Sequence, residues 1–360
     1  MDILKKIILT YGSDWEKMPA GQTNDIWRTL DTVMNIKKML SNMSYNVKTM
    51  KVDTAFEEQL KKIKKKDSDT LIYWLNEFIN PEYTRSPENF TVNIIERIGL
   101  PHTGSSSKIL ALGLNKYRTK QLFNELGIKT PDCYIVNIGN LNIINEHDWD
   151  FPVIIKPLLH GDSLGIGKKS VVNGNNYRAI RKLVSAIHLE FEESVLVEKF
   201  IGGDFVQELT ISVLIDHLGR IVNLPFIEMD FTKISPDQKY KFIYDTFKMG
   251  IIPFKILSKS NETIDICKEC NKIIKKMKCV DFARLDIRIN ESGRFYIEVN
   301  AYPSKNRGSY FAISANYLGI KPQELLAFSP HQAMLKYGLE VTSQLEQFIE
   351  PILNVFYKKQ

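Results

Sequence analysis

Two short runs on either side of residue 291 alternate between polar and apolar side chains, and this pattern constrains the fold more than any other in the sequence. In residues 284–289 the apolar parity is Leu, Ile and Ile; in residues 295–300 it is Phe, Ile and Val, with Tyr296 on the polar parity. A period of two is typical of strands with one buried face. Residues 291–293, Glu-Ser-Gly, therefore predict a three-residue hairpin loop with glycine at a position of positive φ.

The length of this loop determines which residues face each other. It pairs Asn290 with Arg294, and because antiparallel partners have a constant sum of residue numbers, it places Asp286 opposite Glu298. Directly opposed side chains lie about 5 Å apart at Cβ, and two carboxylates at that distance repel by about 3 kcal/mol at an effective dielectric constant near 20. A positive group must therefore offset the repulsion.

Two interpretations of this carboxylate pair remain open from the residues alone. In the first, Arg284 or Arg288 forms a structural ion network on a solvated face. In the second, a hard divalent cation binds the oxygens of Asp286, Glu298 and Asn300, with water or phosphate completing its coordination. The choice depends on whether the chain also supplies a phosphate site.

The composition is that of an ordinary globular protein of two or three lobes, with 360 residues, 44% apolar and 25% charged. No apolar run approaches the ~20 residues that span a bilayer, and the N-terminus lacks the features of a signal peptide, so we expect a cytoplasmic protein. The net charge of +6 is spread along the chain, which suits a phosphate-bearing ligand without requiring nucleic acid. Cys267 and Cys270 resemble half a zinc site, but the helical spacing around Cys270 predicts a core position instead.

Strand and helix signals alternate through the first hundred residues, at residues 5–12, 25–43, 45–52, 55–66 and 70–76. This order predicts a parallel, doubly wound sheet with a ligand-binding loop at residues 12–21. Helices are expected at residues 115–126 and 176–189. The last thirty residues carry apolar side chains at helical spacing, which predicts a packing helix containing Leu345, Phe348, Ile349, Ile352 and Phe356.

A glycine-rich stretch at residues 161–167 is similar to a P-loop but departs from it. Five residues rather than four separate Gly161 from Gly167, and a strand-like segment follows where a helix would have to begin. Such a loop is also compatible with a plain hairpin connection. Its surroundings favour a phosphate site, because Lys156 lies in an apolar strand and Lys116 at the start of a helix, and a buried ammonium needs an anionic partner.

Several segments together resemble the ATP-grasp superfamily, and within it the D-alanine–D-alanine ligases. They are "NKYRTKQLFNELGIKTPD", "FPVIIKP", "HGDSLGIGK", "VLVEKFIGG", "ELTISV", "ARLDIRI" and "GRFYIEVN", in the order and at about the spacing of that family. The resemblance covers roughly residues 6–327 and implies an α/β protein with α+β lobes. It implies a Rossmann-like N-terminal domain (1–105), a central ATP-grasp lobe (106–197), a C-terminal ATP-grasp lobe (198–330) and a helical extension (331–360).

The same resemblance implies roles at the nucleotide end of the site. It places Lys116 and Lys156 on the nucleotide phosphates and makes the loop from Gly161 to Gly167, with Ser163 and Gly165, a lid over them. It assigns adenine to the hinge residues Glu198, Lys199 and Ile201, and the ribose to Glu208. It assigns two Mg²⁺ ions, or Mn²⁺, to Asp286, Glu298 and Asn300, and the transferred phosphate to Arg284.

At the amino-acid end the match to the family is looser. Glu16 corresponds to the residue that holds the ammonium of the first amino acid, and Asp162 stands where the family has a serine. The residues Ser304 and Ser309 correspond to contacts of the intermediate and of the substrate carboxylate, and Lys248 to the end of a mobile loop. An extra carboxylate at Asp162 favours a larger or more basic substrate than D-alanine.

The resemblance implies an ATP-dependent carboxylate–amine ligase that forms an acyl phosphate and then an amide, releasing ADP and phosphate. Its partners would be ATP and amino acids, without nucleic acid or membrane, and a homodimer is expected. Three alternatives stay open: a specialised ligase for other amino acids, a regulatory module that binds ATP without turnover, and a ligase acting on a macromolecule.

Overall fold

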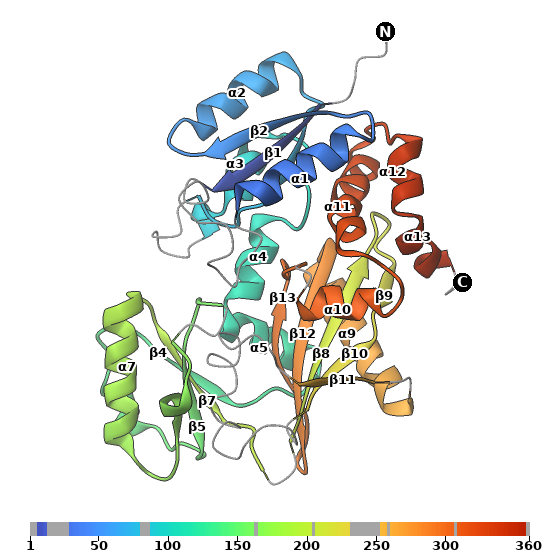
Figure 1. Cartoon of the computed structure of the whole chain (residues 1–360). Helices are drawn as coiled ribbons and strands as arrows, with labels where there is room; N and C mark the ends of the chain where they lie inside the picture. The colour runs from blue at the N-terminus through green and yellow to red at the C-terminus, as the bar shows by residue number, and fades with distance from the viewer. Residues whose placement is uncertain are drawn as a thin grey trace.

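A computed structural model gives the architecture of the chain (Figure 1). Its described residues form three β-sheets with helices packed on them, which confirms the predicted α/β class. The described residues are 6–12, 29–79, 87–161, 165–203, 206–230, 253–257, 260–305 and 308–357.

The N-terminal sheet is parallel, as the alternation of strands and helices predicts. Its order is β2 (Asn46–Val52), β1 (Lys6–Gly12) and β3 (Leu71–Trp74). Helices α1 (Leu30–Ser41) and α2 (Phe56–Lys66) cover opposite faces of it. The reason is the alternation along β1, whose neighbouring isoleucines at 7 and 8 point into different apolar clusters.

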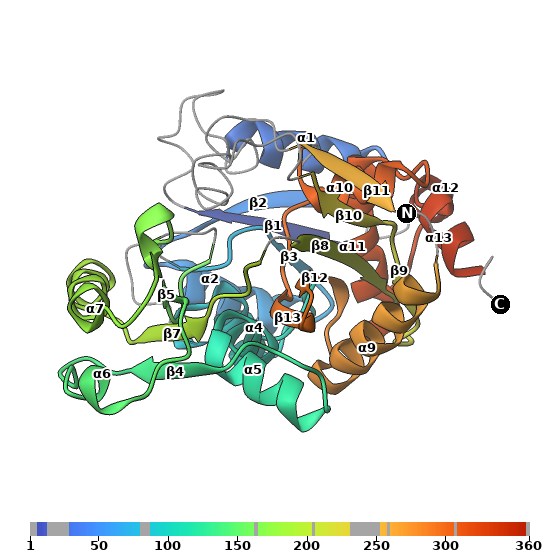
Figure 2. The same ribbon diagram turned by 90° about the horizontal axis from the view of Figure 1, so that it is seen from below.

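In the described part of the connection from this sheet to the rest of the chain there are four short helical segments: η2 (Pro87–Asn89), α3 (Thr91–Ile98), α4 (Ser107–Leu114) and α5 (Lys116–Glu125). The side chain of Asn115 caps α5 by accepting a hydrogen bond from the backbone N–H of Arg118. Seen from below, α4 and α5 lie between the two remaining sheets (Figure 2). They contact strand β13 (Gly293–Asn300) of one, and α5 also contacts β4 (Cys133–Val136) of the other.

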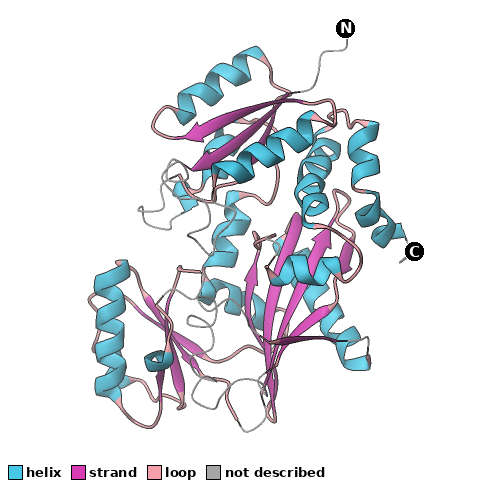
Figure 3. Ribbon diagram, in the orientation of Figure 1, coloured by secondary structure: helices cyan, strands magenta, loops and turns pink. Residues whose placement is uncertain are grey.

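The central lobe is a four-stranded antiparallel sheet with its own apolar core. Its helix α7 (Tyr177–Phe191) packs on one face of the sheet (Figure 3). Its other elements are β4 (Cys133–Val136), α6 (Ile143–Glu146), β5 (Val153–Pro157), η3 (Lys168–Ser170), β6 (Val171–Val172) and β7 (Val195–Lys199).

The C-terminal sheet is antiparallel, with strand β8 at its centre. Its strands are β8 (Gln207–Ile215), β9 (Ile221–Asn223), β10 (Phe226–Met229), β11 (Phe254–Leu257), β12 (Asp281–Asn290) and β13 (Gly293–Asn300). Helix α9 (Asn261–Met277) packs on it, and Cys270 is fully buried there, which confirms the predicted core position. No helix among the described residues has the length and apolar character needed to cross a membrane.

The C-terminal tail forms two helices instead of the single helix predicted. After α10 (Tyr310–Asn316) and α11 (Pro322–Tyr337), the chain continues as α12 (Ser343–Phe348) and α13 (Glu350–Tyr357). The break precedes residue 351, a proline, which lacks the N–H that a continuing helix would need. The predicted packing role is confirmed, because the side chains at 345, 349, 352 and 356 are all buried.

The β12–β13 hairpin differs from the prediction in two ways that cancel each other. Its loop has two residues rather than three, because Asn290 pairs with Gly293. A β-bulge then places one extra residue, Ile297, in β13, so that Asp286 still faces Glu298. The bulge also reverses the parity near the loop. Tyr296, expected on the polar face, is therefore buried in the core at 1% exposure.

Candidate functional site

One face of the C-terminal sheet carries a row of polar side chains on three adjacent strands. The opposite face is apolar and packs on helix α9, because alternate residues of a strand point to opposite faces. The register of β8 with β12, and of β12 with β13, brings the polar residues side by side. We call this the polar face; it consists of Glu208, Thr210 and Ser212 on β8, Arg284, Asp286 and Arg288 on β12, and Glu298 and Asn300 on β13.

Arg284 lies between the two opposed carboxylates. Its Nη2 donates to Asp286 Oδ2 at 2.8 Å and to Glu298 Oε1 at 3.4 Å. Thr210 Oγ1 donates to the other oxygen of Asp286 at 2.8 Å. Burial raises the pKa of Asp286 to about 6, and the negative charge of Glu298 adds to this against the opposing effect of Arg284. Of the two arginines considered as compensating cations, Arg284 is the one that bridges the pair.

The pKa of Glu298 moves in the other direction. Burial alone would raise this pKa, but the charges of Arg284, Lys116 and Lys156 together lower it. Two of these cations come from outside the C-terminal sheet, because Lys116 begins helix α5 and Lys156 lies on strand β5. The polar face therefore meets positive charge from the central lobe across a shared space.

The oxygen donors of the polar face suit a hard divalent cation. Asp286 and Glu298 are opposed carboxylates, and Asn300 follows on the same face of β13. The side-chain oxygen of Asn300 accepts from the backbone N–H of Tyr302 at 2.8 Å, which leaves it a second lone pair. Within the described ranges no group of three His, Cys, Asp or Glu side chains gathers as a metal site, so water or phosphate oxygens would complete the coordination.

Lys116 is buried at the N-terminus of α5. Its Nζ donates to the backbone oxygen of His160 at 2.5 Å, immediately before the glycine-rich loop. Burial lowers the pKa of Lys116 to about 8, although the negative charge of Glu298 opposes this. His160 is held in turn by Glu193, whose carboxylate also accepts from the backbone N–H of Leu159. A lysine in this environment has a strong preference for an anionic ligand.

Lys156 has the anionic partner that its apolar strand requires. Its Nζ donates to Glu198 Oε1 at 2.7 Å, and Lys120 Nζ lies 2.7 Å from Glu198 Oε2. All three side chains are buried. Burial alone would raise the pKa of Glu198, but the two ammonium groups together lower it. Lys120 was not recognised in the sequence, since its spacing from Lys116 on α5 gave no reason to place it beside Glu198.

The hinge after β7 is fixed from both lobes. Lys199 Nζ donates to Asp150 Oδ1 at 2.6 Å and to the Phe151 carbonyl at 2.7 Å, so its side chain points to the central lobe. Arg288 Nη1 donates to the Ile201 carbonyl at 3.1 Å. Nε of Arg288 donates to Glu208 Oε2 at 2.8 Å, which joins the hinge to the polar face. This contact assigns Arg288 to the hinge rather than to the carboxylate pair.

Only part of the glycine-rich loop lies within the described residues. Gly161 has open space around it, whereas Gly165 has φ +72° and a Cβ there would lie 2.7 Å from Pro157 Cγ. A side chain at 165 would therefore be strained and would clash with the end of strand β5. Ser163 and Asp162 lie outside the described residues.

The amino-acid end is described least completely. Glu16 and Lys248 lie outside the described residues, so the structure does not place them. Ser304 is exposed in the segment after β13. Ser309 caps helix α10, its side chain accepting from the backbone N–H of Ala312 at 3.1 Å. The residues that the structure brings together are thus those predicted for the nucleotide and the metal.

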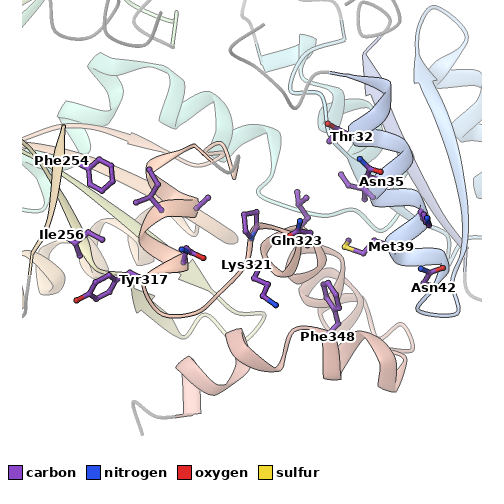
Figure 4. A pocket seen from close by; sticks show the side chains of 17 residues that line it. Thr32, Asn35, Met39, Asn42, Phe254, Ile256, Tyr317, Lys321, Gln323 and Phe348 are labelled. Carbon is purple, nitrogen blue, oxygen red and sulfur yellow. The ribbon is translucent and has the colours of Figure 1, made fainter. Parts of the chain in front are cut away.

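Of two cavities among the described residues, one lies beside this arrangement and the other away from it. A polar one of about 730 Å³ is lined by the hinge residues 199–203 and by the tip of the β12–β13 hairpin, residues 290–292. An apolar groove of about 970 Å³ lies elsewhere, between α1 and the helices α10 and α11. Figure 4 shows Met39, Tyr317 and Phe348 around this groove. None of the predicted site residues lines the groove.

Comparison with known proteins assigns the chain to a family. The family model for the D-ala D-ala ligase C-terminus matches residues 122–328, more than half of the chain. A D-alanine–D-alanine ligase of Pseudomonas putida (strain GB-1) is 31% identical over 237 residues, covering 65% of this chain and 68% of its own length. One of Aquifex aeolicus is 26% identical over 310 residues, covering 86% of this chain and 96% of its own length.

Solved structures agree at the level of the fold. The D-alanine–D-alanine ligase of Bacillus anthracis complexed with ATP aligns with a TM-score of 0.63 at 19% identity, covering 93% of this chain and 99% of that one. The D-alanyl-alanine synthetase A of Vibrio cholerae aligns with a TM-score of 0.64 at 14% identity, covering 92% and 99%. The predicted ATP-grasp fold is thereby confirmed. The chain belongs to the D-alanine–D-alanine ligase family, ATP-dependent ligases that form a carbon–nitrogen bond.

Proposed function

We propose that this protein joins two amino acids through an amide bond in the manner of the D-alanine–D-alanine ligases, with D-alanine as the first substrate to test. The observation that carries this proposal is the meeting of two lobes: the carboxylate pair bridged by Arg284 faces the buried cations Lys116 and Lys156. A nucleoside triphosphate with its metal needs such a combination of anionic and cationic groups.

In the first step, the carboxylate of one amino acid attacks the γ-phosphate of ATP, the bond from that phosphorus to the bridging oxygen breaks, and an acyl phosphate and ADP form. Negative charge gathers on the transferring phosphoryl oxygens, and Lys156 and Arg284 offset it. In the second step, the amine of the other amino acid displaces phosphate and forms the amide. Lys116, held at the His160 carbonyl beside the glycine-rich loop, contributes a further positive charge to the phosphate site.

The metal belongs to the polar face in this proposal. Asp286, Glu298 and Asn300 would hold Mg²⁺. We further expect two ions at this site and expect that Mn²⁺ can take their place. A divalent cation supplies positive charge that screens the phosphate oxygens from an attacking carboxylate. Arg284 is positioned by the same two carboxylates, which keeps its guanidinium at the edge of the phosphate site.

The nucleoside end is proposed to lie at the hinge. Glu208 would accept hydrogen bonds from the ribose hydroxyls, and Arg288 holds that carboxylate in place. The adenine would meet Glu198, Lys199 and Ile201, partly through backbone groups. The side chain of Lys199 is bound to Asp150, which is consistent with a backbone role for this residue.

Phosphate release from ATP across pairs of D- and L-amino acids, followed by mass analysis of the product, tests the function. We expect release that depends on both amino acids, with D-alanine pairs active and a dipeptide as product. Release that requires a different pair, above all a larger or basic residue, would assign a specialised ligase. Tight ATP binding without release for any pair would instead indicate a regulatory module and contradict the proposal.

A homodimer and a cytoplasmic location are expected with this function. Light scattering of the purified protein at micromolar concentration tests the first, and fractionation of cells that express the chain tests the second. A monomer at all concentrations would overturn the dimer without affecting the catalytic proposal.

A further inference from the structure

Three buried charged side chains form a chain of contacts at the junction of α5, β5 and β7. Glu198 contacts Lys156 through one carboxylate oxygen and Lys120 through the other, both at 2.7 Å. The exposed fractions are 1% for Lys120, 6% for Lys156 and 3% for Glu198. We call this group the lysine–glutamate triad. In a site this dry, each ion pair is electrostatically strong and an uncompensated charge is costly.

The charge of the triad differs from that of a simple ion pair. Lys156 and Glu198 alone would be neutral, so an anion approaching Lys156 would meet a cation already matched by a carboxylate. With Lys120 on the far oxygen, the two lysines and one glutamate carry a net charge of +1. Lys120 therefore changes the charge seen by a ligand of Lys156 without needing to touch that ligand.

Lys120 is fixed in this position by a second set of contacts. Its Nζ donates to Thr130 Oγ1 at 3.1 Å, and that hydroxyl donates to the carbonyl of Tyr296 at 2.7 Å. Tyr296 lies on β13, two residues before Glu298 in sequence. Lys120, which is buried, is thus held both by Glu198 in the central lobe and, through Thr130, by the strand that carries part of the polar face.

We propose that Lys120 is a positioning residue for nucleotide binding, which matches the charge of Glu198 so that the charge of Lys156 stays available to a polyphosphate. This inference rests on the proposed function, because it takes a nucleoside triphosphate as the ligand of Lys156. The preference for an anion is a property of the triad as a unit. A ligand without phosphates gains nothing from Lys120.

Replacement of Lys120 separates this role from a purely structural one. The measurement is the dissociation constant of a non-hydrolysable ATP analogue and of adenosine, both by competition with a fluorescent nucleotide at fixed magnesium. We expect Lys120→Met to raise the dissociation constant of the ATP analogue by about tenfold to a hundredfold, the order expected for one buried charge near a phosphate. The dissociation constant of adenosine should change by less than about threefold. A general loosening of the site would weaken both ligands alike.

Two further variants complete the design. Lys120→Arg keeps the charge and should restore most of the triphosphate affinity. Arg118→Met removes an exposed cation from the same helix, α5, and should leave both ligands unchanged. Thermal unfolding of each variant shows that the protein under test is folded.

A double variant gives the sharpest test. Glu198→Gln removes the charge that Lys120 matches, so Lys120→Met combined with Glu198→Gln should return the ratio of triphosphate to adenosine affinity to within a few-fold of the wild type. The ratio cancels any loss of adenine contacts at Glu198. If Lys120→Met lowers both affinities equally, the inference is wrong. It is also wrong if the double variant changes the affinity ratio by the sum of the two single effects instead of restoring it. If the wild-type protein binds neither ligand, the proposed function itself fails.

Discussion

Two carboxylates of this protein are buried to a similar extent, Glu198 at 3% exposure and Asp281 at 0%, yet their surroundings differ. Glu198 contacts two ammonium groups between the lobes. Asp281, at the start of β12, accepts from the hydroxyl of Ser329 on α11 and from the backbone N–H of Gly104 at 2.9 Å. The first lies beside the proposed nucleotide site and the second joins three segments of the fold.

The pKa values of the two groups move in opposite directions. Burial raises the pKa of Asp281 to about 6, because its hydrogen bonds from Ser329 and Gly104 offset only part of the lost hydration. Burial also acts on Glu198, but Lys120 and Lys156 lower the pKa below its usual value. Equal burial therefore does not give equal chemistry. At these two sites, the carboxylate that contacts two ammonium groups favours its charged form, and the one held only by a hydroxyl and a backbone N–H is shifted toward its neutral form.

The largest effect is expected where the cationic cluster meets the ligand. Lys156→Ala should lower ATP turnover and amide formation by about a thousandfold or more, because charge on the transferring phosphoryl group is left unbalanced. Glu298→Ala should act similarly through the polar face. Steady-state phosphate release measures both, and circular dichroism confirms that the fold survives. Near-normal turnover in either variant would contradict the claim that the cations around Glu198 and the polar face act on the nucleotide.

At Asp281 the expected effect is on stability and depends on pH. A raised native pKa means that the native state binds more protons than the unfolded state between about pH 4 and 6, so the free energy of unfolding falls as pH rises through that window. Relative to Asp281→Asn, the wild type should lose at most about 3 kcal/mol there. Urea unfolding at several pH values measures this. Asp31→Asn, exposed on α1, is the control.

Glu198→Gln should show the opposite sign. Because the native pKa of Glu198 is lowered, its ionised form stabilises the fold above the unfolded pKa, and this contribution is lost as pH falls through the native pKa. The difference in the free energy of unfolding between the wild type and Glu198→Gln should therefore shrink only as the pH becomes acidic. If Glu198→Gln and Asp281→Asn shift in the same direction with pH, the distinction between contact cations and dipoles is wrong.

A smaller effect is expected at Arg288, which fixes the hinge and Glu208. Arg288→Met should raise the Michaelis constant for ATP by about tenfold while kcat changes little, because bound geometry is lost without a loss of charge at the reacting atoms. Arg288→Lys keeps the charge but not the forked contacts and should recover only part of the affinity. A fall in kcat with an unchanged Michaelis constant would instead place Arg288 at the chemistry.

The smallest effect is expected at an exposed pair. Lys61 on α2 lies 3.1 Å from both Glu57 and Glu58, all three being solvent-accessible. Lys61→Ala should leave turnover and unfolding unchanged within error, because water and salt screen such pairs. A clear loss of stability in Lys61→Ala would show that burial is not the reason why charged groups such as Glu198 and Asp281 affect the protein more than this exposed pair does.

The nucleotide and metal residues could be predicted in good part from sequence. The expected three-residue loop places Asp286 opposite Glu298, and the structure keeps that pairing with a two-residue loop and a bulge instead. The lone lysine in an apolar strand at 156 signals a buried ion pair. These signals are local, because period and burial follow from neighbouring residues. The structure brings the predicted residues together, while their roles in binding remain predictions. The lobe boundaries of the sequence analysis also remain predictions.

What could not be predicted depends on contacts between distant segments. The bulge at Ile297 has no signature in the alternation, and it places Tyr296 in the core, where its hydroxyl donates to Glu269 at 2.8 Å. Lys120 meets Glu198, 78 positions away in number, only because α5 contacts β4 and β4 pairs with β7. Arg288 likewise finds Glu208 through the pairing of β8 with β12. Such partners follow from topology, which a pattern of single residues does not contain.

The bulge in β13 has a consequence for how this hairpin can vary. The short turn alone would set Ile297 against Asp286 and rotate Glu298 toward the hydrophobic layer; the extra residue restores the alignment. The spacing of the acidic pair is thus stored in the returning strand rather than in the turn. If the turn took up Gly293 as a third loop residue, Asp286 would stay opposite Glu298 only with Ile297 paired instead of bulged, so the turn length and the bulge should change together.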